Sequence, residues 1–297
     1  EIMPSLVGSE MCIRDRDTSG SGKSAAQLLA DGKCSAALDE SGETTSLQTV
    51  SYSDTTWALL FNAAEGSVFQ NQQLRQALAG IARENATVPS GGLYAASKGL
   101  VPEGLTVDGL DYRDAAGDPL PTISEPKALY LAARQGMATS DFSGVTLLLP
   151  KNAGLGELAD QINSAWQKEC SLFFSVEEVE QDEFDARIAA GKYTIALAPI
   201  RAEGGSVYQM LQQFTTAGGS LTGYADPVYA DRLALSAQQT GKDRCALLAQ
   251  CERQLLESCT VVPLLAQQKR LLLANGVQDL VFDPFFPVLD LTWAKMS

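Results

Sequence analysis

Residues 55–83 read TTWALLFNAAEGSVFQNQQLRQALAGIAR. Residues 56–61 form a short apolar run rich in Trp, Leu and Phe, which predicts a buried strand. A loop follows, and Asn71 is a residue type that commonly caps the N-terminus of a helix. The apolar residues after Asn71 repeat at the i, i+3, i+4, i+7 spacing of a half-buried helix. They are Leu74, Ala77, Leu78 and Ile81. The stretch therefore predicts a strand, a loop and an amphipathic helix.

Strands and helices alternate most clearly between residues 145 and 198. Three β-rich apolar runs are separated by two segments with helical periodicity. The predicted strands are 145–149, 172–179 and 193–198, and the predicted helices are 156–170 and 182–190. This alternation indicates parallel βαβ units with right-handed crossovers. The chain is therefore predicted to be an α/β protein.

Other segments complete the predicted organisation. Helices are expected at residues 25–30, 127–134, 227–239 and 243–258, and strands at 47–52 and 260–265. The stretch 85–125 is rich in Pro and Gly and has no clear periodicity. It also contains apolar residues such as Leu100, Val101 and Leu105, so we expect it to pack as an ordered loop.

Composition excludes several classes of function. The chain has 297 residues, a net charge of −14 and no histidine. An acidic surface disfavours nucleic acid and anionic membranes. The absence of histidine excludes Ser-His or Cys-His nucleophile pairs and any His-ligated metal site. No apolar run approaches the roughly 20 residues of a transmembrane helix, and the six cysteines match no zinc or redox spacing.

The first 16 residues, EIMPSLVGSEMCIRDR, are not typical of a natural protein segment. They lack the cationic and apolar regions of a secretory signal. The string SLVGSEMCIRD resembles translated sequencing-adaptor DNA. We therefore interpret residues 1–16 as an artefactual tag and expect natural sequence to begin near Asp17, inside a longer protein.

Residues 17–24, DTSGSGKS, are close to the phosphate-binding loop G-x-x-x-x-G-K-[ST]. Gly22, Lys23 and Ser24 fit the pattern, but Asp17 occupies its first glycine position. The loop also needs a buried strand before it, and only the tag precedes it. We interpret it as a turn that starts the helix at 25–30. A P-loop nucleotide-binding protein stays an alternative, as does an α/β enzyme of unknown reaction.

Several stretches together resemble the family 5 extracellular solute-binding proteins, the oligopeptide- and dipeptide-binding components of ABC importers. In the opening stretch these are LLFN, LRQAL and AR. The others are LVPEG at 100–104, EFDARIAAGKYTIALAP at 183–199, GYADPVYAD at 223–231 and TVVPLL at 260–265. The resemblance extends from about Ala25 to the C-terminus and is distributed over many short matches.

The resemblance implies a periplasmic-binding-protein-like fold of type II, cluster C, with two lobes, of which this chain holds the rear of lobe 1 and all of lobe 2. Residues 17–60 with 264–297 would form the lobe 1 remnant and hinge, and 61–263 would form lobe 2. Strands 56–62 and 260–265 would cross the hinge.

The resemblance also implies a function. The protein would capture a peptide or similar small solute between its lobes and deliver it to a membrane permease, with no bond made or broken. It would be a monomer without cofactor or catalytic residues. It would act outside the cytoplasm, held to the membrane only through a missing N-terminal lipid anchor.

Candidate ligand-binding residues follow from strand ends, because ligands of open α/β sheets bind at the carboxyl ends of strands. Aromatic residues there could stack on a ligand, and an arginine could bind a carboxylate in bidentate fashion. The candidates are Trp57, Asn62, Arg201, Glu203, Tyr208 and Tyr224. Glu203 would replace the acidic residue that pairs with the α-amino group of the ligand in peptide-binding members. Acidic pairs such as Glu177/Glu178 are interpreted as solvated charges.

Overall fold

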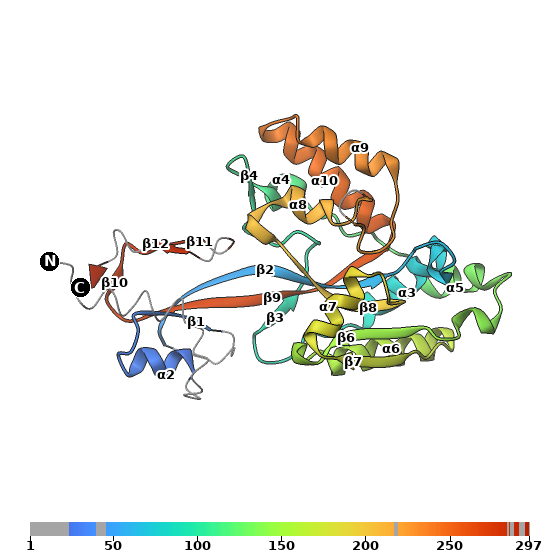
Figure 1. Ribbon diagram of the computed structural model, residues 1–297, viewed down its shortest axis with the longest axis horizontal. Helices are drawn as coiled ribbons and strands as arrows, with labels where there is room; N and C mark the ends of the chain where they lie inside the picture. The colour runs from blue at the N-terminus through green and yellow to red at the C-terminus, as the bar shows by residue number, and fades with distance from the viewer. Residues whose placement is uncertain are drawn as a thin grey trace. The chain divides into compact units, whose positions relative to one another are not determined.

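The computed structural model describes residues 24–39, 46–216, 219–283, 285, 288–290 and 295–296 (Figure 1). The tag at 1–16 and residues 17–23 of the DTSGSGKS stretch lie outside the described residues. The chain divides into two compact units. Unit 1 comprises Glu1–Asp54, Ser90–Ala95 and Gln267–Ser297, and unit 2 comprises Thr55–Pro89 and Ala96–Ala266.

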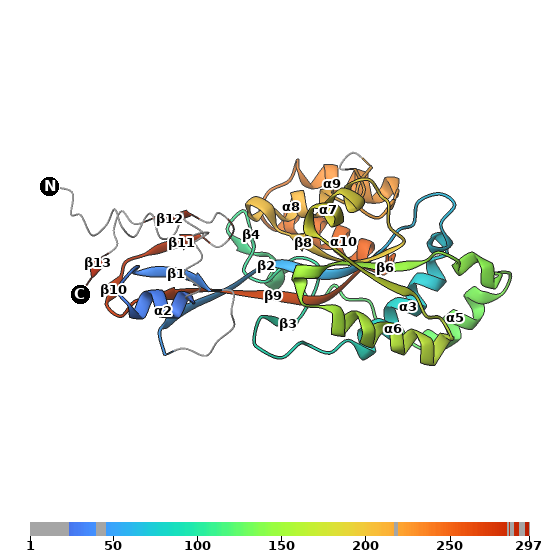
Figure 2. The same cartoon turned by 60° about the horizontal axis from the view of Figure 1, so that its bottom comes forward.

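Unit 1 contains a short helix beside an antiparallel strand pair (Figure 2). Strand β1 (Ala36–Asp39) pairs with the end of strand β9 (Val261–Leu273), with Ala36 opposite Leu273. Helix α2 (Ala25–Ala30) begins at its N-cap Ser24, which forms a capping box with Gln27. A small apolar cluster, Leu29, Cys34 and Leu272, joins the helix to the strands. The predicted helix at 25–30 is confirmed.

Short strand pairs make up the rest of unit 1. Strand β3 (Tyr94–Ala96) pairs with β9, β10 (Val277–Gln278) with β13 (Lys295–Met296), and β11 (Val281–Asp283) with β12 (Val288–Asp290). The predicted terminal segment 282–291 falls partly outside the described residues.

Unit 2 is built on a sheet whose strand order is β2-β8-β6-β7. These strands are β2 (Gln48–Phe61), β8 (Ile195–Arg201), β6 (Thr146–Pro150) and β7 (Ser175–Val179). Strand β6 is parallel to both β7 and β8, whereas β2 is antiparallel to β8. The parallel βαβ arrangement predicted from the sequence is confirmed. On the other side of β2 the order continues to β9 and β1.

Helix α3 (Gln72–Asn85) is the amphipathic helix predicted within residues 55–83. Its N-cap is Asn71, whose Oδ1 accepts a hydrogen bond of 3.1 Å from the Leu74 N–H. The four predicted apolar positions of this helix are all buried. It packs against α5 (Pro126–Arg134) and α6 (Gly156–Cys170), and the Trp166 indole of α6 donates a hydrogen bond of 2.9 Å to the Leu78 carbonyl of α3.

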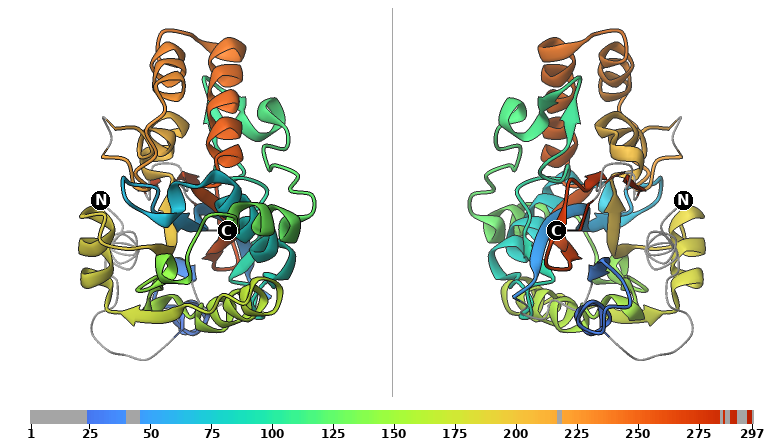
Figure 3. Two further views of the ribbon diagram at one scale, coloured as in Figure 1. Left: turned by 90° about the vertical axis from the view of Figure 1, so that its right-hand side faces the viewer. Right: turned by 90° about the vertical axis from the view of Figure 1, so that its left-hand side faces the viewer.

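Helix α7 (Gln181–Ala189) covers the opposite face of this sheet. The chain passes from β6 through α6 to β7, then reverses through α7 to β8 on the other side of β6. Because both crossovers are right-handed, this reversal puts α6 and α7 on opposite faces. Figure 3 shows α7 separated by the strands from α3, α5 and α6. The sheet therefore has a switch point between β6 and β8.

The remaining helices of unit 2 form a second group. Helix α9 (Pro227–Ser236) and α10 (Gly241–Glu257) pack side by side, with α8 (Val207–Gln212) and the short α4 (Tyr112–Ala116) against α10. A two-residue turn joins β4 (Thr106–Val107) to β5 (Leu110–Asp111). Four 3-10 helices are also described: Val68–Gln70, Thr139–Phe142, Lys151–Ala153 and Glu203–Gly205.

Two sequence predictions need adjustment. The strands predicted at 47–52 and 56–61 are one continuous strand, β2, and the strand predicted at 260–265 continues to Leu273. Polar residues interrupt both apolar runs, which is why the pattern ended early. One of them, Asp54, pairs with Lys269 of β9 at 2.8 Å. The charges are therefore compensated by the neighbouring strand.

No helix in the described part of the chain combines the length and the apolar character needed to cross a membrane.

Candidate functional site

A pocket of about 150 Å³ opens in unit 2 at the carboxyl end of β8. Its walls come from the end of β8, from Leu60 of β2, from one face of α7, and from the segments that follow β8. The lining residues are Leu60, Gln181, Phe184, Asp185, Ile188, Ala198, Pro199, Ile200, Arg201, Glu203, Gln213 and Leu221. Open α/β sheets bind ligands at the carboxyl ends of their strands, and the pocket has this position on β8.

The pocket has an apolar floor and a polar rim. Leu60, Phe184 and Ile200 are buried, and each lines the pocket. Arg201 and Glu203 are exposed at the rim. An apolar floor with a few polar groups at the edge is the usual composition of a site for a small solute, since apolar area gives affinity and the polar groups fix orientation.

Two of the six predicted ligand-binding residues, Arg201 and Glu203, line this pocket. Arg201 is the last residue of β8, and Glu203 begins the 3-10 helix that follows. Neither side chain has a hydrogen bond or an ion pair within the described part of the chain. Both are therefore available to a ligand. The other four predicted residues are not among the lining residues.

The side chain of Asn62 is hydrogen-bonded to the protein backbone. Its Nδ2 donates hydrogen bonds to the carbonyl oxygens of Gly191 (3.0 Å) and Tyr193 (2.9 Å), and its Oδ1 accepts one of 3.1 Å from the Ala64 N–H. These bonds tie the end of β2 to the segment that leads into β8. Trp57, opposite Pro199 in the β2–β8 pair, is 5% exposed.

Tyr224 belongs to a polar group at the start of α9. Its hydroxyl donates a hydrogen bond of 2.9 Å to Asp226 Oδ2, and its ring meets that of Tyr229 edge-on at 5.6 Å. Burial and the neighbouring carboxylate raise the pKa of Tyr224. Asp226 in turn caps α9 through the N–H groups of Val228 and Tyr229. Tyr208 is half-buried on α8.

The face of α7 that lines the pocket was not predicted from the sequence. Gln181, Phe184, Asp185 and Ile188 repeat at the i, i+3, i+4, i+7 spacing of one helix face. Phe184 and Ile188 are the apolar residues of this face, and the polar residues Gln181 and Asp185, at i−3 and i+1 from Phe184, are the signal that could have revealed it. Gln181 Nε2 donates a hydrogen bond of 2.9 Å to Asp185 Oδ1.

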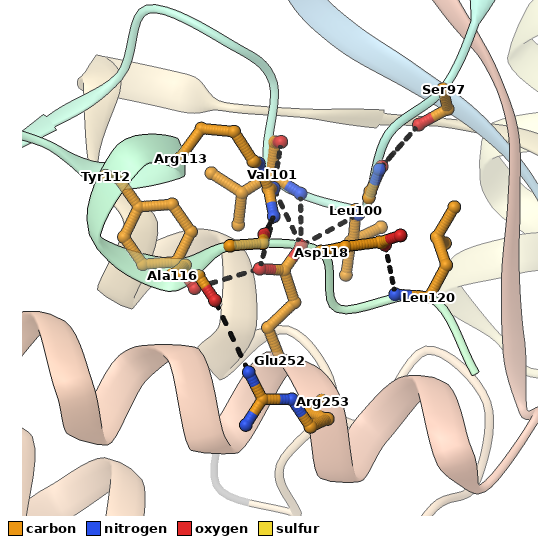
Figure 4. Close-up of polar contacts among 12 residues, drawn as sticks. Ser97, Leu100, Val101, Tyr112, Arg113, Ala116, Asp118, Leu120, Glu252 and Arg253 are labelled. Carbon is orange, nitrogen blue, oxygen red and sulfur yellow. Dashed lines mark hydrogen bonds and ion pairs between the residues drawn. The ribbon is translucent and has the colours of Figure 1, made fainter. Parts of the chain in front are cut away.

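A buried charge cluster also lies in unit 2, around Glu252 of α10 (Figure 4). Glu252 is 0% exposed. Its Oε1 accepts hydrogen bonds from the N–H groups of Leu100 (2.9 Å) and Val101 (3.0 Å). The Tyr112 hydroxyl donates to Oε2 at 2.9 Å, and the Arg113 guanidinium binds both oxygens at 3.0 and 3.2 Å. Burial, then the Glu252 charge, raises the pKa of Tyr112.

This cluster fixes the segment after β3 onto α10. A Cβ at Gly99 would come within 2.7 Å of Arg113 Nη2 and 2.8 Å of Glu252 Oε1, so the close approach requires glycine. Each Glu252 oxygen already has at least two donors, and none of these residues lines the pocket. The predicted irregular stretch is therefore a packed segment, held by a saturated buried carboxylate.

The described residues contain no group of three or more His, Cys, Asp or Glu side chains that could hold a metal ion. Cys170, Cys245, Cys251 and Cys259 are buried thiols without disulfides. Burial raises the pKa of Cys170, Cys251 and Cys259 to about 11. These thiols are therefore protonated at neutral pH and poor nucleophiles.

Comparison with known proteins gives matches among solved structures alone. No protein-family model matches the chain, and neither does any curated protein. An oligopeptide ABC transporter substrate-binding domain from Bacillus anthracis is 16% identical with a TM-score of 0.70, over 92% of this chain and 56% of that one. Peptide-bound OppA of Listeria monocytogenes is 18% identical with a TM-score of 0.67, over 92% and 56%.

The Escherichia coli murein tripeptide binding protein MppA is 15% identical with a TM-score of 0.62, over 86% of this chain and 52% of that one. The chain thus spans about half the length of the solved proteins it matches. At these identities the likeness concerns the fold. The chain has the α/β fold of the substrate-binding proteins of oligopeptide ABC transporters, over the part of that fold that it spans.

Proposed function

We propose that this protein is the solute-binding component of an ABC importer and that its ligand is a peptide or a similar small solute. The observation that carries the proposal is the pocket at the carboxyl end of β8, in a fold shared with proteins whose names state that they bind peptides. The protein binds its solute and makes no chemical change to it.

Arg201 and Glu203 are the proposed ligand contacts in this pocket. A guanidinium can bind a carboxylate or a peptide carbonyl, and a carboxylate can accept hydrogen bonds from an ammonium group. Trp57, Tyr208 and Tyr224 do not line this pocket and stay predictions from the sequence. Asn62, also predicted from the sequence, bonds only backbone groups and is proposed here as a structural residue.

The proposal extends to the intact protein. Residues 17–60 with 264–297 would belong to lobe 1 and the hinge, and 61–263 to lobe 2. Closure of the lobes on the solute would present it to the permease. The protein would work as a monomer and would be lipid-anchored. It would act outside the cytoplasm, and the name of one similar protein, a murein tripeptide binding protein, states that it is periplasmic.

A peptide panel tests this function. Thermal unfolding would be followed with di- to tetrapeptides, and isothermal titration calorimetry would give Kd for each peptide that raises Tm. A ligand at 100 times its Kd should stabilise the folded state by about 2.7 kcal/mol. Arg201→Ala should weaken binding about tenfold or more, because a charge-assisted hydrogen bond contributes roughly 1.5–3 kcal/mol.

Lys192→Ala is the matched control, since Lys192 is an exposed cation just before β8 that does not line the pocket. It should leave Kd unchanged. If no peptide raises Tm, or if Arg201→Ala and Lys192→Ala bind as the parent protein does, the proposed site is wrong.

A further inference from the structure

The polar rim of the pocket has an excess of negative charge. Asp185 and Glu203 contribute two carboxylates, and Arg201 contributes the one cation among the lining residues. Arg201 forms no ion pair with either carboxylate in the described part of the chain. The two negative charges are therefore not neutralised within the pocket.

Hydrogen-bonding capacity is similarly unbalanced. Asp185 accepts one hydrogen bond, from Gln181 Nε2, which also holds the carboxylate in place. An ionised carboxylate offers about four acceptor sites, so most of the capacity of Asp185 is unused within the described residues. The Glu203 carboxylate accepts no hydrogen bond within the described residues. A ligand group rich in N–H donors matches this surplus of acceptors.

The surroundings of the pocket reinforce this charge. Five further acidic residues lie within the stretch 177–183, at the end of β7 and the start of α7: Glu177, Glu178, Glu180, Asp182 and Glu183. The cations that pair with this group are Lys151, 2.8 Å from Glu180, and Arg187, which binds Glu177 and Glu183 at 2.8 and 2.5 Å. Acidic residues remain in excess. A concave site whose lining and surroundings carry an excess of one sign of charge attracts ligands of the opposite sign.

Volume limits what can enter. A cavity of about 150 Å³ holds a molecule of benzene size, whereas pockets that hold a whole drug-sized ligand measure roughly 300–1,000 Å³. The pocket, at about 150 Å³, therefore matches a single side chain rather than a complete peptide. Its apolar floor suits the methylene stem of a long side chain, with the charged end at the rim.

We propose that Asp185, together with Glu203, determines specificity by selecting a ligand residue with a positively charged side chain, of the lysine or arginine type. This inference rests on the proposed solute-binding function. It assigns a role to a residue of α7, whereas the sequence placed the ligand contacts on β2, on β8 and in the segments after β8.

The test compares the tripeptides Ala-Lys-Ala, Ala-Gln-Ala and Ala-Glu-Ala by calorimetry at low salt. All three carry the same termini, so differences in Kd report the side chain. Ala-Lys-Ala should bind about fivefold more tightly than Ala-Gln-Ala, because each exposed charge pair adds only a small factor to the affinity. Ala-Glu-Ala should bind most weakly, and the differences should shrink as salt is added.

Asp185→Asn should reduce the preference for lysine about threefold. Asp182→Asn is the matched control, because it removes the same charge from the same helix at an exposed position outside the pocket lining. It should preserve most of the preference. N-acetylated versions of the peptides should keep the same order of affinity, because the free α-ammonium group is not the group selected.

Three outcomes overturn the inference. Equal binding of the three tripeptides would refute charge selection and leave the proposed function standing. Loss of the preference on N-acetylation would assign the pocket to the α-ammonium group instead. If no peptide of any charge binds, the proposed function fails and the specificity role fails with it.

Discussion

At the scale of single residues, Glu252 is expected to matter most for stability. Glu252→Ala would leave Arg113 and two backbone N–H groups buried without their partner. Breaking a buried ion pair costs about 3–5 kcal/mol, and we expect a loss of that size in the free energy of unfolding measured with urea. Glu257→Gln, an exposed position on the same helix, should change it by less than about 0.5 kcal/mol.

A substitution at Asn62 distinguishes a structural role of this residue from a role as a ligand contact. All its side-chain hydrogen bonds go to backbone groups, so Asn62→Ala should lower the free energy of unfolding by about 1–3 kcal/mol. Peptide affinity of the folded variant should stay within about twofold, measured by calorimetry. A variant with unchanged stability and weakened binding would instead support the ligand contact predicted from the sequence.

At the scale of elements, a substitution at Asn71 tests whether this N-cap stabilises the start of helix α3. Its side chain bonds the Leu74 N–H at 3.1 Å. Asn71→Ala should destabilise the protein by about 1 kcal/mol in urea unfolding, the usual cost of losing an N-cap. Gln73→Ala, at an exposed position in the first turn, should have no measurable cost. Equal effects of the two substitutions would contradict the capping role.

Local patterns predicted the elements well where no polar residue interrupted the apolar pattern. The helix Gly156–Cys170 and the helix Ala25–Ala30 agree with their predicted bounds. Strand β2 was predicted as two pieces because Ser53 and Asp54 interrupt its apolar run, and the pairing of Asp54 with Lys269 compensates the charge inside the continuous strand. Such compensation joins residues far apart in sequence, so a local pattern does not contain it.

The pocket was predicted in part for a related reason. Arg201 and Glu203 follow a predicted strand, and the rule for open α/β sheets places ligands there. Asp185 lies on a helix, and its approach to the same pocket depends on which face of the sheet that helix covers. That face follows from the strand order, which the sequence alone does not define.

At the scale of the whole molecule, the buried thiols should make the protein less stable as the pH becomes alkaline. Cysteine ionises near pH 8.5 in an unfolded chain, whereas burial raises the pKa of Cys170, Cys251 and Cys259 to about 11. Between these values the unfolded state binds fewer protons, so the free energy of unfolding should fall as pH rises.

Urea unfolding between pH 7.5 and 11 measures this dependence. Each thiol should contribute a fall of up to about 1.4 kcal/mol per pH unit. Cys170→Ala should lower the free energy of unfolding at every pH. It should also reduce the slope of the free energy of unfolding against pH by about the contribution of one thiol. An unchanged slope in this variant would contradict the assignment of the pH dependence to the buried thiols.

The central claim is that a solute binds at the carboxyl end of β8 in unit 2. Amide hydrogen exchange, recorded with and without a peptide that raises Tm, locates the bound region directly. We predict slower exchange in residues 200–206 and on α7, and loss of that protection in Arg201→Ala. Protection confined to other segments, with residues 200–206 and α7 unchanged, would contradict the claim.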